Sequence, residues 1–197
     1  MAMSSYYPLS TPTTIGIESI TIRAANAVVA SQSPFTYKQQ IVSHQGQRWE
    51  ASVSIPSTRR DLSAEWIAML VALKGQTGTF LLGDPDYATP RGSVSSCVVT
   101  GTAGDETVSV VMTGTLKAGD YIQLGAGSSA RLHKVLLDKS GNGNLEIWPN
   151  LRSNYTSQTA IFNNPKGLFR LNQSVSGWSI NNASAYGISF EAVEVVV

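Results

Sequence analysis

The sequence predicts a mainly β protein with one packing α-helix and two β-rich parts. Three observations support this prediction. Residues Arg48–Pro56 alternate apolar and polar side chains, which is the pattern of a half-buried strand. One segment, Trp66–Leu73, has apolar residues at helical spacing. From Ser96 to Phe162, short β-rich segments follow one another between Gly-containing turns.

The composition is that of a compact globular chain. Its 197 residues are 42% hydrophobic and 14% charged, which is sufficient for a buried core. Lys and Arg total 14 against 13 Asp and Glu, and the longest basic run is Arg59–Arg60, interpreted as a solvated turn before the helix. Because nucleic-acid affinity depends on clustered cations, we expect no specific nucleic-acid partner.

Cys97 is the only cysteine, so an internal disulfide framework and a thiol metal cluster are excluded. This favours assembly in a reducing cytoplasm. The first residues lack the basic start and apolar stretch of a signal peptide. No segment approaches the roughly 18 apolar residues of a membrane span. We therefore expect neither export by a signal peptide nor insertion in a membrane.

The N-terminal third is predicted to be a β meander. Its strands are expected at Ile15–Arg23, Tyr37–Ser43 and Arg48–Pro56. The segment His44–Gln47 contains a glycine and lies between the last two strands, which predicts a hairpin closed at that loop. In the third strand, one face carries Trp49, Ala51, Val53 and Ile55.

The predicted helix has recognisable end signals. Ser63 is suited to the N-cap and Gly75 to the C-terminal stop. Leu62 and Ile67 are expected to form a hydrophobic staple across the first turn. A helix of about eleven residues is marginal alone, so it should pack its Trp66 face on the sheet.

A second β-rich part follows the buried strand Thr79–Leu82 and the turn-rich segment Gly83–Gly92. Its dense short strands favour an OB-like β-barrel. These strands are Ser96–Thr100, Thr107–Met112, Asp120–Leu124, Arg131–Asp138, Leu145–Trp148 and Thr159–Phe162.

Three later strands are expected to complete the N-terminal part: Gly167–Leu171, Val175–Ile180 and Tyr186–Val195. The predicted architecture is therefore a β-sandwich domain with one packing α-helix, interrupted by an inserted OB-like β-barrel. The sandwich comprises residues 1–91 and 163–197, and the barrel comprises residues 92–162.

No catalytic, cofactor-binding or metal-binding residue is assigned, and an enzyme is not expected. The chain has no nucleophile elbow, phosphate-binding loop, dinucleotide fingerprint or His-Glu-x-x-His pair. His44 and His133 have no neighbouring Cys, Asp or Glu at metal-ligand spacing, so structural roles are favoured.

Two acidic fragments are interpreted as turns. Asp138–Gly143 resembles the start of a calcium loop, but Pro149 stands where the final Glu is required. An Asn142-Gly143 hairpin turn is the favoured interpretation. Asp84 and Asp86 flank a proline, which is typical of a surface turn rather than of paired acid–base catalysis.

Several motifs, in their order along the chain, resemble the distal tail protein (Dit) family of siphophages, in its T-five-like form with an inserted OB-fold domain. Ile15–Ile20 is similar to the family's opening strand, and Glu65–Leu70 lies where the family has its helix. Within the barrel, Gly114–Ile122, Lys134–Val135 and Leu145–Leu151 follow in the family's order. Residues 25–34 have no counterpart in the family pattern.

This resemblance implies a structural protein of the virion, assembled in the host cytoplasm and located at the distal end of a phage tail. It implies a hexameric ring that connects the tail tube to hub or baseplate proteins and to fibre proteins. The family has no catalytic residues to transfer.

Two other functions remain open. An OB-like barrel can bind carbohydrates or a receptor, and Tyr87, Tyr121, Trp148 and Tyr155 could provide the stacking surface. Such aromatic residues are more often part of a core, because their apolar area must be buried. A cell-wall hydrolase would need paired carboxylates or a metal triad, and the sequence predicts neither.

Overall fold

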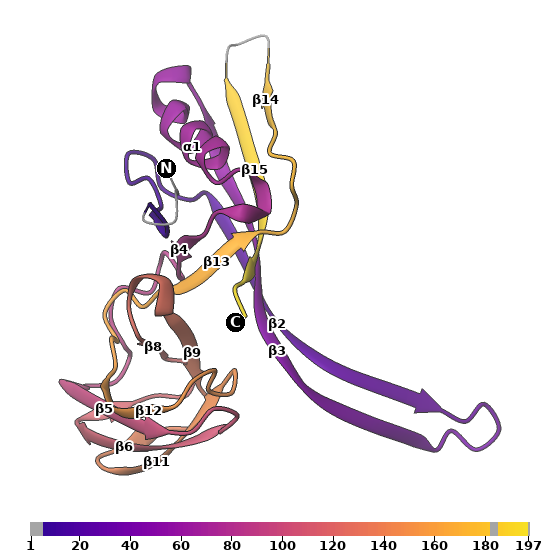
Figure 1. Ribbon diagram of the computed structural model, residues 1–197, viewed down its shortest axis with the longest axis vertical. Helices are drawn as coiled ribbons and strands as arrows, with labels where there is room; N and C mark the ends of the chain where they lie inside the picture. Colours follow the sequence, from indigo (N-terminus) through magenta and orange to yellow (C-terminus); the bar gives the residue numbers. More distant parts are fainter. Residues whose placement is uncertain (1–5, 182–184, 197) are drawn as a thin grey trace.

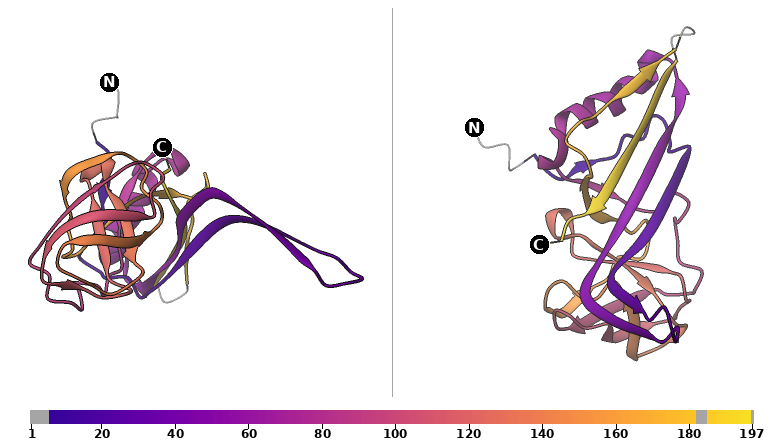
Figure 2. Two further views of the ribbon diagram at one scale, coloured as in Figure 1. Left: turned by 90° about the horizontal axis from the view of Figure 1, so that it is seen from below. Right: turned by 90° about the vertical axis from the view of Figure 1, so that its right-hand side faces the viewer.

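The computed structural model describes residues 6–181 and 185–196 (Figure 1). Strands make up 50% and helix 10%, and the sheets curl into half-barrels, so the predicted mainly β sandwich or barrel class is confirmed. A curled sheet with one helix forms the body at one end, and a small barrel lies at the other. A long β-hairpin projects away from both (Figures 1 and 2).

The body contains a seven-stranded sheet. Because β13 and β15 lie between β4 and β3, this sheet joins segments from before and after the barrel. All its pairs are antiparallel except β1 with β4. The order is β1 (Leu9–Ser10), β4 (Phe80–Leu82), β13 (Gly167–Leu171), β15 (Tyr186–Glu194), β3 (Gln39–Thr58) and β2 (Ser19–Gln32), with β14 (Trp178–Ile180) also paired to β15.

The predicted hairpin loop at His44–Gln47 is wrong. β3 continues through these residues, and Gln47 pairs with Asn26 of β2. The register shifts by a bulge between Asn26 and Val28, and a Cβ on Gly46 would lie 2.9 Å from the Ala27 Cβ. Gly46 therefore allows the strands to approach closely instead of turning the chain. The actual turn spans residues 33–38, where Tyr37 is left-handed with φ of 53°.

The alternating segment of β3 is confirmed as a half-buried strand. Its core-facing side chains, which are at most 3% exposed, are Trp49, Ala51, Val53 and Ile55.

Helix α1 (Arg60–Ala72) begins earlier than predicted. Arg59 is its N-cap, whereas Ser63 lies inside the first turn and is buried. The Ser63 hydroxyl lies 2.8 Å from the Thr58 hydroxyl, so it bonds to the preceding strand and not to a helix end. Leu62 is likewise inside the helix and exposed, which excludes the predicted staple. The helix ends before Gly75, as expected, and the short 3₁₀ helix η2 (Gly75–Thr77) follows.

The barrel is a six-stranded sheet closed on itself. Its edges are joined by one bridge between Gln123 of β8 and Ile161, which follows β12, and the two backbones exchange hydrogen bonds of 2.7 and 2.9 Å. The order is β12 (Tyr155–Thr159), β5 (Ser96–Gly101), β6 (Thr107–Thr113), β11 (Gly143–Trp148), β9 (Arg131–Val135) and β8 (Tyr121–Leu124). The barrel also carries the short pair β7 (Thr115–Leu116) and β10 (Lys139–Ser140), and the 3₁₀ turn η3 (Gly127–Ser129).

Two barrel strands differ from their predicted bounds by three or more residues at one end or both, and the other four differ by one or two residues. The last strand is Tyr155–Thr159 instead of Thr159–Phe162, because this polar segment pairs with β5 as an exposed strand. The strand beginning at Arg131 ends at Val135 instead of Asp138. The apolar residues Leu136 and Leu137 led to the longer predicted strand, but both side chains are exposed.

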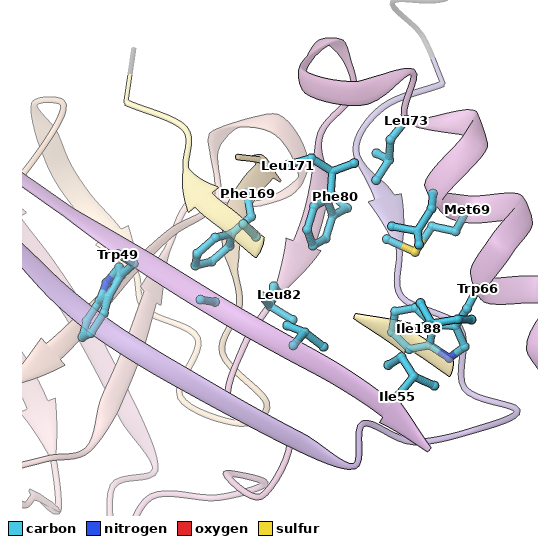
Figure 3. Close-up of a cluster of buried hydrophobic side chains, with 14 of the residues drawn as sticks. Trp49, Ile55, Trp66, Met69, Leu73, Phe80, Leu82, Phe169, Leu171 and Ile188 are labelled. Carbon is cyan, nitrogen blue, oxygen red and sulfur yellow. The ribbon is translucent and has the colours of Figure 1, made fainter. Parts of the chain in front are cut away.

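The molecule has two hydrophobic cores. The first lies between the body sheet and α1, around Trp66, Phe80 and Phe169 (Figure 3). It also includes Tyr121 and Leu132 from the barrel. The second fills the barrel and contains Cys97, which is fully buried. Burial raises the pKa of the Cys97 thiol to about 11, so this cysteine is a core residue without thiolate reactivity.

The division into two domains remains a prediction with a direct test. The barrel has its own core, and both its borders lie in turn-rich segments, so limited proteolysis should release a resistant fragment with ends near Pro90 and Asn164. Mass spectrometry would identify those ends. Initial cleavage within Val108–Val111 of β6 would contradict this division.

Candidate functional site: a projecting arm and its root

The main candidate for an interaction surface is the far half of the β2–β3 hairpin. We call residues Ala27–Gly46 the arm. Its ladder continues beyond the bulge from the Val28–Ser43 pair to the Gln32–Gln39 pair, a length of about 13 Å at about 3.3 Å per residue. Figure 2 shows it extending clear of the body and the barrel. An isolated two-stranded ribbon is marginally stable in water, so the arm is suited to binding a partner.

The arm carries exposed apolar side chains on both faces. Phe35 and Tyr37 at its tip are 91% and 75% exposed. Residues 24–49 contain no carboxylate, and Lys38 is the cation nearest the tip. Exposed apolar surface of this kind marks an interaction site. The exposed apolar residues of the strands are Val28, Val29, Ile41 and Val42.

The root of the arm is held by one barrel segment, Trp148–Arg152. Asn26 and Gln47 pair across the ladder at the base of the arm. The Trp148 indole donates to Asn26 Oδ1 at 2.9 Å, and the Asn150 backbone N–H donates to Gln47 Oε1 at 2.8 Å. The Arg152 guanidinium donates to the Gln47 backbone oxygen. These contacts hold the direction in which the arm leaves the body.

A buried ion pair reinforces the root. Arg152 Nη2 lies 3.7 Å from Glu194 Oε2, and the two side chains are 10% and 1% exposed. The same carboxylate oxygen accepts the Trp49 backbone N–H at 3.0 Å. Burial raises the pKa of Glu194, although the Trp49 N–H and the Arg152 charge act in the opposite direction. The pair joins β15, β3 and the barrel.

His133 is a structural residue of the same junction. It is fully buried, and its Nδ1 lies 2.7 Å from the Pro149 backbone oxygen, which identifies Nδ1 as the donor. Burial lowers the pKa of His133 from 6.5 to about 4, and the charges of Arg152 and Arg131 act in the same direction. His133 is therefore neutral near pH 7. His44 lies in the arm, on β3, instead of in a loop.

Three of the four aromatic residues considered for a glycan surface meet at the junction. Tyr87 and Tyr121 lie 5.3 Å apart between ring centres, Tyr121 and Trp49 6.0 Å, and Trp49 and Trp148 4.4 Å. The Trp49 indole also donates to a barrel backbone oxygen at 2.8 Å. Tyr155 instead packs on the barrel core. The rings connect the body to the barrel and do not form an open stacking platform.

A cavity of about 370 Å³ opens beside these rings. Lys134 Nζ lies 4.4 Å from the centre of the Tyr121 ring and 3.1 Å from its hydroxyl oxygen. Burial raises the pKa of the neighbouring Tyr87 to about 12, so the Tyr87 phenol is not a base near neutral pH.

The remaining sequence candidates have local structural partners. The Asp138 carboxylate accepts hydrogen bonds at 2.8 Å from Lys117 Nζ and the Ala118 N–H, and Asn142 Oδ1 accepts the Met112 N–H at 2.9 Å. Asp84 Oδ1 accepts the backbone N–H of Asp86 at 3.1 Å in a turn.

The described residues hold neither a candidate metal cluster nor a candidate membrane-spanning helix. No group of three or more His, Cys, Asp and Glu side chains could hold a metal ion there. Within residues 6–181 and 185–196, no helix combines the length and apolarity needed to cross a membrane.

The arm and its root were missed by the sequence interpretation. The available signal was the absence of carboxylates over residues 24–49 combined with β-branched pairs such as Val28–Val29 and Ile41–Val42. Asn26 and Gln47 have no sequence signal, because their partners lie more than a hundred residues away.

Comparison with protein-family models gives no match, and none of the curated proteins matches the chain. The resemblance to distal tail proteins therefore depends on the sequence motifs alone.

We expect Arg152→Met to lower the free energy of unfolding by about 3 kcal/mol, because it leaves the Glu194 carboxylate buried without its cation. Adding Glu194→Gln should recover most of this loss, since Gln still accepts the Trp49 N–H. Urea unfolding at pH 7 would measure both. Equal losses in the single and double variants would contradict the pairing.

The pH dependence of stability tests the state of His133. Between pH 6.5 and about 4, the unfolded chain binds a proton on His133 that the folded chain excludes. The free energy of unfolding should therefore decrease by about 3 kcal/mol as the pH is lowered through this range. His133→Asn keeps a donor for Pro149 and does not titrate. Urea unfolding of both proteins across this range isolates the contribution, because Glu194 is common to both. Parallel pH curves would refute it.

Proposed function

We propose that this chain is a structural subunit of the tail tip of a long-tailed phage. Copies of the chain form a hexameric ring that connects the tail tube protein to hub, baseplate and fibre proteins. The observation that carries the proposal is the arm, which presents apolar side chains to solvent at the end of a braced hairpin.

A ring requires each subunit to present two different, complementary surfaces. A projecting arm supplies one of them, because it reaches beyond the body towards a neighbouring copy. The contacts at its root support this role, since an arm of defined direction loses less conformational entropy when it docks. The family resemblance supplies the location in the virion.

A carbohydrate- or receptor-binding barrel has less support. Tyr121 is only 5% exposed, and the rings near it pack on one another. A hydrolase also has less support, because in the Asp84 and Asp86 pair weighed for acid–base catalysis the Asp84 carboxylate accepts the Asp86 backbone N–H in a turn.

Antibody labelling of phage particles tests the location. We expect label at the tail tip and six copies around the tail axis in cryo-electron microscopy. Label along the tube, or a single copy on the axis, would contradict the proposal.

Variants of the arm test its role in assembly. Phe35→Ser with Tyr37→Ser should abolish association of the subunits, because it removes the exposed apolar surface at the tip. The free energy of unfolding should change by less than about 0.5 kcal/mol, since both side chains are exposed. Light scattering over a concentration series measures association. Val111→Ser, which changes a 63% exposed residue of the barrel, is the matched control and should associate normally.

A further inference from the structure

The body sheet has an opening beside β15. On that side of β15, pairing with β14 ends at Ile188 and pairing with β13 begins at Ala192. Residues 173–177 leave the sheet between these two points, and a cavity of about 650 Å³ lies there. We call this cavity the groove.

The groove is lined by both apolar and hydroxyl side chains. Its accessible apolar lining consists of the exposed Val175 and the partly buried Phe190, whereas Leu70 and Leu171 are only 1% and 3% exposed. Hydroxyl side chains of β2, β3 and β15 complete the lining. Among its described lining residues, Glu191 carries the only charge. Glu191 is exposed, and it accepts a hydrogen bond from the Asn172 side chain at 3.2 Å.

The arm tip has the complementary chemistry. Phe35 is a nearly fully exposed aromatic residue, and Lys38 follows three positions later in the same turn. A groove with accessible apolar side chains and one carboxylate suits an aromatic side chain with one neighbouring cation. The absence of carboxylates from the arm removes repulsion with Glu191.

The arm cannot reach the groove of its own chain. The same hairpin lines the groove at Ser19, Thr21 and Ser54 and carries the tip at its other end. Thr21 and Gln32 of β2 are about 35 Å apart at about 3.3 Å per residue. A tip that enters a groove must therefore come from another copy, and the contact is head-to-tail, as ring closure requires.

We propose that the groove receives the arm tip of a second copy of this chain, with Phe35 against Val175 and Phe190 and with Lys38 beside Glu191. This inference rests on the proposed ring and specifies which surfaces meet in it.

Disulfide trapping between separately expressed variants tests the contact. Thr36→Cys on one copy and Ser189→Cys on another leave Phe35, Lys38 and Glu191 unchanged, and the native Cys97 is buried. Mild oxidation of the mixture should give a crosslinked dimer. Thr36→Cys mixed with Leu136→Cys, which places the second thiol beside the cavity at the aromatic junction, is the matched control and should crosslink at least fivefold less.

Charge reversal then tests the ion pair, with the yield of the trapped dimer as the measurement. Lys38→Glu and Glu191→Lys should each lower the yield about fivefold, and the two together, one on each copy, should restore it. Glu146→Lys, at an exposed position on β11, should have no effect.

These experiments distinguish failure of the proposed groove contact from failure of the proposed ring. Two results would refute docking in the groove without contradicting the ring. One is association by light scattering without the Thr36–Ser189 crosslink, and the other is a stronger crosslink to Leu136→Cys. Neither association nor crosslink at any concentration would overturn both. Lack of rescue by the double reversal would refute the Lys38–Glu191 contact.

Discussion

The carboxylate of Glu194 is buried at the junction of the sheet and the barrel, where it requires a compensating cation. Arg152 supplies that charge from the barrel, and the Trp49 N–H supplies a donor from β3. Arg152 also contacts Gln47 at the base of the arm. One electrostatic requirement therefore links the body, the barrel and the arm.

This arrangement separates the rigid part of the molecule from the part suited to binding. Apolar burial, the aromatic contacts and the ion pair all lie on the body side of the Asn26–Gln47 pair. Beyond it, the arm has only its own ladder and a turn. A surface with little internal stabilisation can gain most from a partner, which agrees with a role in assembly. The barrel, in turn, acts as a brace for the arm as well as a folded unit.

Sequence reasoning succeeded where a periodic pattern coincided with burial. The alternation from Trp49 to Ile55 identified a real core-facing strand, and the spacing around Trp66 identified the helix. It failed where one residue type has two physical uses. Gly46 permits close approach at a bulge but was interpreted as a turn, and Ser63 bonds to the end of β3 but was interpreted as a cap. The root of the arm depends on contacts between residues far apart in sequence, which local patterns do not encode.

The bulge between Asn26 and Val28 has a consequence for how such a hairpin can vary. Between the Asn26–Gln47 and Val28–Ser43 pairs, β2 has one residue and β3 has three, so the pairing of the arm is offset by two residues from that of the body. Adding two residues to each strand of the arm would lengthen it and keep each side chain of the tip on its side of the ribbon, whereas adding one would exchange the two sides. Reach can therefore evolve in steps of two residues per strand, which would let one body design serve assemblies of different diameter.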